Sequence, residues 1–160
     1  MLDEGSTVED IEDFFHALLK VESSNSPMSL SNAVQLYYDN VATFERHMAQ
    51  YQAFKETADL PDATPPSRVE LLFLAAYHLI AACAAKRGQH INKPQNVRLE
   101  LERNPVILGD RADRVWRAFN DLQGDFRAKF VYRGRWTGKD LADAVRAFET
   151  VERLCMEALR

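Results

Sequence analysis

The stretch DFRAKFVYRGRWTGK, residues 125–139, contains the side chains best suited to contact a ligand. It interleaves basic and aromatic residues. Aromatic faces stack on bases, and guanidinium or ammonium groups contact phosphates. The composition therefore predicts a surface for single-stranded nucleic acid or phosphate, with these candidate residues: Arg127, Lys129, Tyr132, Arg133, Arg135 and Trp136.

The same stretch also fits a structural role at the end of a helix. In that interpretation Phe126 and Phe130 are core residues and Trp136 closes one end of the helical packing. Arg133 and Arg135 are then solvated cations with no ligand. Both interpretations stay open, because aromatic residues at helical spacing are commonly buried.

The charge of the chain is divided unevenly along its length. The net charge is −4, but residues 1–66 hold 12 acidic and 3 basic side chains, whereas residues 67–160 hold 12 acidic and 17 basic ones. A local positive field attracts phosphate even when the whole molecule is acidic, although alternating charges on helix surfaces often mark only a solvated face.

The histidines and cysteines predict no metal site and no cofactor. His16, His47, His78 and His90 lie on different predicted elements, with no His-x3-His and no Glu-x-x-His spacing. The two cysteines form no Cys-x-x-Cys, and no glycine-rich nucleotide-binding motif occurs. Three residues remain as secondary candidates. His78 lies on an apolar background, where a histidine is more often a core or interface residue, and the pair His90 and Lys93 follow a predicted helix end and could contact an anion.

The apolar residues recur every three or four positions in each long segment, which predicts an all-α protein. We expect helices over residues 6–22, 29–58, 66–87, 110–131 and 137–159, with a short one beginning at Pro94. The predicted architecture is an up-and-down four-helix bundle. An accessory N-terminal helix precedes it, and the short helix lies between the third and fourth long helices. We expect residues 1–28 to form an acidic helix and a Ser-rich connector, and residues 29–160 to form the bundle domain.

Spacing also predicts how these helices pack and where they end. Residues 30–51 carry an apolar seam in 4-3 alternation: Leu30, Val34, Tyr37, Val41, Phe44, Met48 and Tyr51. The alanine-rich helix over residues 66–87 is expected at the centre of the core. Capping boxes are predicted at Ser67 with Glu70 and at Thr137 with Asp140, and Gly88 is predicted to end the alanine-rich helix.

The sequence favours a cytoplasmic protein with no membrane partner. Its acidic N-terminus lacks the basic region of a signal or transit peptide. The longest strongly apolar run is LLFLAAYHLIAACAA, of about 15 residues, whereas a membrane span needs about 20. Cys83 and Cys155 sit in apolar helical stretches, where free cysteines behave as small hydrophobic residues.

Three segments in the second half of the chain resemble the HEPN domain, a helical family widespread in prokaryotes. The run AAYHLIAACAAKRG, residues 75–88, is similar to the family helix with a Tyr, small residues and a closing Gly. KPQNV, residues 93–97, resembles its Lys-x-His segment with Gln95 in place of the His. RAKFVY, residues 127–132, resembles its Arg-x-x-Ala-Asp-Tyr signature but replaces the Ala-Asp pair by Phe130 and Val131. With residues 137–159 as the final helix, the resemblance covers about residues 67–159.

The resemblance implies a helical bundle that usually dimerises. Family functions range from ribonuclease toxins to non-catalytic partners of small nucleotidyltransferases and RNA-binding modules. Nuclease members carry an Arg, four to six intervening residues and a His, whereas the position five after Arg127 is Tyr132 here. A tyrosine with a pKa near 10 is a poor general base at neutral pH.

We therefore expect a non-catalytic, dimeric HEPN-like module that binds RNA, a nucleotide or a protein partner encoded by a neighbouring gene. Such a partner would be of the toxin–antitoxin or nucleotidyltransferase type. One alternative is a metal-independent ribonuclease centred on Arg127, with His78 or His90 as its base. Another is a purely structural or regulatory helical dimer built on the seam of residues 30–51.

Overall fold

The computed structural model describes residues 30–160, so the predicted N-terminal helix and Ser-rich connector lie outside the described residues. Within that part of the chain the structure is helical and contains no strand, which confirms the all-α class. The elements are, in order, α2 (Leu30–Ala58), α3 (Pro65–Lys86), η1 (Pro94–Asn96), α4 (Val97–Arg103), η2 (Gly109–Arg111), α5 (Ala112–Asn120), η3 (Asp121–Phe126), η4 (Ala128–Tyr132) and α6 (Gly138–Leu159).

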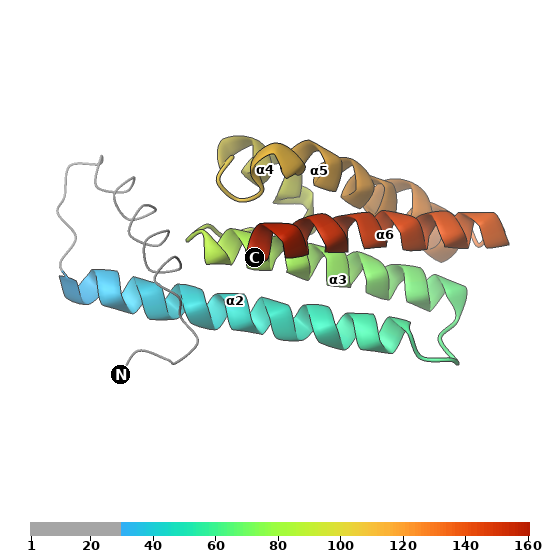
Figure 1. The fold of residues 1–160 in the computed structure, drawn as a ribbon. Coiled ribbons are helices and arrows are strands. Elements are labelled where there is room, and N and C mark those ends of the chain that lie inside the picture. The colour runs from blue at the N-terminus through green and yellow to red at the C-terminus, as the bar shows by residue number, and fades with distance from the viewer. Residues whose placement is uncertain (1–29) are drawn as a thin grey trace.

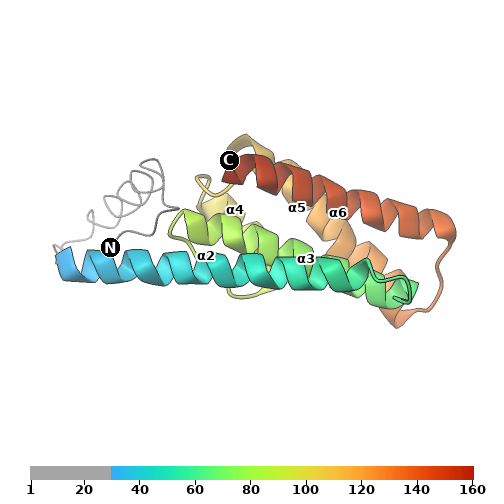
Figure 2. The same ribbon diagram turned by 60° about the horizontal axis from the view of Figure 1, so that its bottom comes forward.

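Helix α3 lies at the centre of the described structure, as the sequence predicts. It runs antiparallel to α2 and packs along it, and α6 lies against it in the same direction as α3 (Figures 1 and 2). The segment from α5 to η4 packs against both α3 and α6. Helix α2 is joined to α6 by Glu152, which accepts hydrogen bonds from the Tyr51 hydroxyl and from the Lys55 ammonium.

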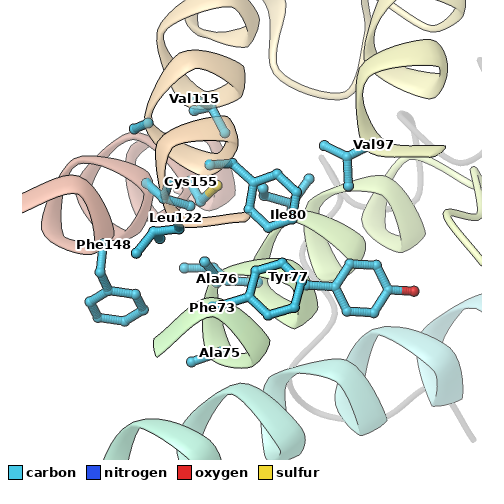
Figure 3. Packing of buried hydrophobic residues seen from close by; sticks show 14 of the residues in the cluster. Phe73, Ala75, Ala76, Tyr77, Ile80, Val97, Val115, Leu122, Phe148 and Cys155 are labelled. Carbon is cyan, nitrogen blue, oxygen red and sulfur yellow. The ribbon is translucent and has the colours of Figure 1, made fainter. Parts of the chain in front are cut away.

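The small side chains of α3 explain its central position. Thirteen of its residues are buried, and six of these are alanines, so neighbouring helices can approach the α3 backbone closely. The core around it is seen in Figure 3, where residues from α3, α4, α5, η3 and α6 converge. Phe73 stacks on Phe119 at 5.5 Å between ring centroids. The Tyr77 hydroxyl, which points away from the centre of this cluster, donates a hydrogen bond to the Ile91 carbonyl.

The ends of α3 differ in part from the prediction. The Thr64 side chain caps the helix by accepting from the Ser67 amide, and Pro65 and Pro66 occupy its first turn. The predicted Ser67–Glu70 capping box is therefore wrong, because the cap lies three residues earlier and Glu70 is engaged by Arg127. Gly88, with φ +69°, follows the helix end as predicted, since only glycine adopts that conformation at little cost.

The predicted uninterrupted helix over residues 110–131 is also wrong. A 3₁₀ turn (η2) precedes α5, and the chain then continues as two π-helical segments, η3 and η4. The apolar residues after Leu122 are spaced by four and four, at Phe126 and Phe130. Such spacing exceeds 3.6 residues per turn, and the wider π turns keep Leu122 and Phe130 buried.

The apolar seam of α2 is buried only in part. Tyr51 is buried and Met48 packs against the core, but Val34 is 47% exposed. The side chains of Leu30 and Tyr37 are outside the described set. Since α2 has 29 residues and its partner α3 has 22, the N-terminal turns of α2 extend past the end of α3 (Figure 2).

Helix α3 is long and apolar enough to cross a membrane when judged by length and composition alone. In the most apolar window of this helix, 72% of the residues are buried inside the protein. That burial is typical of a core helix in a folded domain.

Candidate nucleic-acid interface

Arg127, between η3 and η4, is tied to α3. Its Nε and one terminal nitrogen donate to the two carboxylate oxygens of Glu70 at 2.7 and 2.9 Å. Its guanidinium carbon lies 4.1 Å from the centroid of the Phe73 ring, and its side chain is only 20% exposed. The hydrogen bond to Glu70 raises the pKa of Arg127 above its usual range. Arg127 thus serves as a positioned, charge-compensated link to α3.

Lys129 is compensated in a similar way. Its ammonium donates to Asp140 at 3.1 Å. The same carboxylate accepts from the Thr137 amide at 2.8 Å, and the Thr137 hydroxyl accepts from the Asp140 amide, so the predicted capping box of α6 is confirmed. The hydrogen bond from the Thr137 backbone amide has the largest effect on the pKa of Asp140 and lowers it. The hydrogen bond from Lys129 lowers it further.

The two aromatic candidates differ in their exposure. Phe130 is buried, and the Trp136 ring stacks on it with 5.1 Å between centroids while remaining 38% exposed. Tyr132 is 73% exposed, which is high for an aromatic side chain. Trp136 therefore covers the end of the core with one face, and Tyr132 offers its ring to solvent.

Arg133 and Arg135 lie in the exposed connection between η4 and α6. Their backbone amides donate to the carbonyls of Ala128 and Lys129 at 2.9 and 3.1 Å. Gly134 between them has φ +61°, a left-handed conformation that places the two arginines on a tight turn. In the described part of the chain no side-chain ion pair or hydrogen bond is formed by either guanidinium.

We call these four exposed residues, Tyr132, Arg133, Arg135 and Trp136, the basic–aromatic tip. It combines one exposed ring and one partly exposed ring with two guanidinium groups that no carboxylate of the described residues compensates. The chemistry available to it is electrostatic contact with phosphate and stacking on a planar group. Arg127 and Lys129, predicted as members of the same surface, instead hold its base in place.

The secondary candidates lie elsewhere. His78 follows Glu70 on α3 by eight residues, which is roughly 12 Å along a helix axis. His90 and Lys93 are exposed in the connection between α3 and η1. The structure therefore does not gather the candidate residues into one site: the tip occupies one location, and the histidines occupy another.

The imidazole of His78 lies against a residue that sequence reasoning did not select. The Nδ1 atoms of His47 in α2 and His78 in α3 are 2.9 Å apart, within hydrogen-bonding distance. Burial, with a smaller contribution from His47, lowers the pKa of His78 to about 4. The pKa of His47 is lowered mainly by burial, and the charges of Arg46 and His90 lower it further. Because 31 residues separate the two histidines, no local sequence motif could predict that they lie in contact.

The described residues contain no cluster of three or more His, Cys, Asp or Glu side chains arranged to hold a metal ion. Cys83 and Cys155 are buried free thiols, and a hydrogen bond from the Cys155 thiol to Cys83, reinforced by burial, raises the pKa of Cys155. They are therefore unsuited to act as thiolate nucleophiles.

No protein-family model, curated protein or solved structure matches this chain.

Proposed function

We propose that this chain is a non-catalytic HEPN-like helical module that binds single-stranded RNA through the basic–aromatic tip. The observation that carries the proposal is the presence of two solvent-exposed guanidinium groups, of Arg133 and Arg135, that have no ion-pair partner in residues 30–160 and lie next to the exposed Tyr132 in the chain. Exposed cations bind phosphate by releasing counterions, and an exposed ring stacks on a base of any sequence.

The cations of this region differ in whether they are paired with a carboxylate, and this difference supports the assignment. Arg127 and Lys129 have carboxylate partners, so their positive charges are largely cancelled. Their ion pairs fix the η4 segment to α3 and to the start of α6. The exposed arginines therefore project from an anchored base, which lowers the entropy lost when a ligand binds.

The surroundings of Arg127 support a binding role over cleavage. Glu70 already engages two of the Arg127 nitrogens, and the ring of Tyr132 lies 6.0 Å from its guanidinium carbon. The imidazoles of His78 and His90 lie away from it. A ribonuclease centred on Arg127 stays as the alternative, tested by incubating mixed RNA with the protein and with Arg127→Ala; equal background cleavage in the two samples rejects it.

The wider assignment includes a homodimer in the cytoplasm, an up-and-down arrangement of four helical segments, and a protein partner encoded by a neighbouring gene. The alternating directions of α2, α3, the α5–η4 segment and α6 support the up-and-down arrangement (Figure 1). The exposed Val34 on the seam of α2 supports a second copy as its partner. Sedimentation equilibrium at micromolar concentration tests the dimer, and a monomeric mass contradicts it.

RNA binding is tested by fluorescence anisotropy with a labelled single-stranded oligonucleotide at several salt concentrations. We expect Arg133→Ala with Arg135→Ala to weaken binding and to reduce the slope of log K against log salt by about 1.4, since each single-strand phosphate contact contributes about 0.7.

The matched control is Arg103→Ala with Arg114→Ala, which removes two exposed arginines from α4 and α5. This control lowers the net charge equally but leaves the tip intact, so its slope should stay close to that of the wild type. Equal slopes for the two double variants, or no binding by the wild type, would reject the tip as an RNA surface.

A further inference from the structure

The contact between α2 and α3 contains a pair of imidazoles that the proposed RNA surface does not use. His47 and His78 are both half-buried, and their Nδ1 atoms are 2.9 Å apart. From this juxtaposition we propose that His47 and His78 form a two-imidazole site for a first-row divalent transition metal that prefers square or octahedral coordination, such as Ni²⁺ or Cu²⁺. The proposal does not depend on RNA binding.

The separation of the two nitrogens determines which coordination geometry fits. Imidazole nitrogens bind such metals at about 2.05 Å, so two nitrogens 2.9 Å apart subtend an angle of about 90° at a shared ion. A tetrahedral angle of about 109° would need the nitrogens to be about 3.3 Å apart. A right angle is the cis angle of the tetragonal and octahedral centres that Cu²⁺ and Ni²⁺ prefer.

The protonation state of the pair also suits metal binding. A metal requires the neutral imidazole, and the pKa values of His47 and His78 are both lowered, mainly by burial. Among the described residues, the charged groups outside the pair that lower its pKa values are Arg46 and His90, and none of them is a carboxylate. Within residues 30–160, no anion is therefore seen to favour the protonated form of either ring.

The packing around the pair shapes the site. Phe54 of α2 stacks on the His78 ring at 5.6 Å between centroids, and Tyr77 lies 5.0 Å from the same ring. These rings shield one side of His78. Without a metal the two Nδ1 atoms share one hydrogen bond, so one ring carries its proton on Nδ1. On metal binding that proton moves to Nε2 of the same ring through solvent, and no net proton is released.

Two protein ligands leave the other coordination positions to water. In the described part of the chain no third metal-ligating side chain completes the cluster, so His90 is not a ligand although its charge reaches His47. The expected affinity is accordingly modest, and Arg46 lowers it further by repulsion. Because the ligands come from α2 and α3, metal binding should stabilise the contact between these two helices.

The test uses the full chain, stripped with a chelator and then titrated with Ni²⁺ or Cu²⁺. Thermal unfolding should shift upward by about 3–5 °C when free metal reaches ten times its dissociation constant. Electron paramagnetic resonance of the Cu²⁺ sample should show hyperfine coupling to two nitrogen nuclei. Mg²⁺ at the same concentration should cause no shift, because it prefers oxygen ligands.

Three single variants separate this pair from adventitious binding. His47→Gln and His78→Gln should each abolish the shift and the two-nitrogen signal, and either one suffices if the other fails to fold. His90→Gln is the matched control, an exposed neighbouring histidine, and should keep both. No shift in the wild type, a shift that survives in His47→Gln and His78→Gln, or its loss in His90→Gln would overturn the proposal.

Discussion

Arg127 and Arg133 are six residues apart and have opposite surroundings. Arg127 is held by Glu70 and by the face of Phe73, whereas the Arg133 side chain is exposed and unpaired within the described structure. A partly buried charge pair is costly to break, because the remaining carboxylate loses its partner. The same substitution at these two positions should therefore affect different properties.

Arg127→Ala should lower the free energy of unfolding by about 2–3 kcal/mol, since it removes two charge-assisted hydrogen bonds and leaves Glu70 unpaired. Arg133→Ala should change it by less than about 0.5 kcal/mol, as is usual for exposed positions. Urea unfolding of both variants checks this. Equal stability of the two would contradict a structural role for Arg127.

His78 should make stability depend on pH in the acidic range. Its pKa is lowered to about 4 in the folded protein, against about 6.5 in the unfolded chain. The unfolded state therefore binds the proton first as pH falls. The stability contributed by neutral His78 is complete above about pH 6.5 and is lost between about 6.5 and 4.

Between pH 7.5 and pH 4.5 the wild type should lose about 2 kcal/mol more stability than His78→Gln, after allowance for partial solvent exposure. Urea titrations of both proteins at these two pH values, without metal, measure the difference. Parallel pH profiles would show that the His78 imidazole titrates normally in the folded state.

At the scale of elements, the π-helical segments determine where the chain leaves the core and therefore where the basic–aromatic tip lies. The widened turns of η3 and η4 keep Leu122 and Phe130 buried while the chain reaches the exposed turn at Gly134. Irregular helical turns of this kind often occur at functional sites. Gly124 lies inside η3 and Gly134 lies in the turn after η4, and only Gly134 has a positive φ, which makes them a matched pair.

Gly124→Ala should stabilise the protein by about 0.5–1 kcal/mol, because a Cβ there meets no atom within 4 Å and alanine reduces the entropy of the unfolded chain. Gly134→Ala should destabilise it by about 1 kcal/mol, since φ is +61° at that position. Thermal unfolding of the two variants gives the comparison. A stabilising Gly134→Ala would show that the turn adopts another conformation in solution.

At the scale of the whole molecule, Glu152 connects α2 to α6 across the central helix. It accepts from the buried Tyr51 hydroxyl and from Lys55. Burial, reinforced by the hydrogen bond to Glu152, raises the pKa of Tyr51, so this phenol stays protonated and donates at physiological pH. The cluster is a structural link between helices that otherwise meet mainly through α3.

Glu152→Ala should cost about 1–3 kcal/mol, because it leaves the Tyr51 hydroxyl buried without an acceptor. Tyr51→Phe should cost only about 0.5–1.5 kcal/mol, since Glu152 keeps Lys55 as its partner. Chemical denaturation of both variants tests the order. The opposite order would indicate that the hydroxyl reaches another acceptor.

The sequence by itself determined the helical class, the central position of α3 and the caps at Gly88 and Thr137. These properties depend on apolar periodicity and on side chains within a few residues of each other, which local physics controls. Periodicity could not reveal the π turns, because a spacing of four fits an α-helix as well over a short stretch.

Only the tertiary structure decided which cations are free. Arg127 and Arg133 look equivalent along the chain, but Glu70 lies 57 residues from Arg127 in sequence and still forms two hydrogen bonds with it. The His47–His78 pair depends in the same way on the antiparallel packing of α2 and α3. Contacts between distant segments are set by how whole helices pack, and that information is spread over the core and is absent from any single motif.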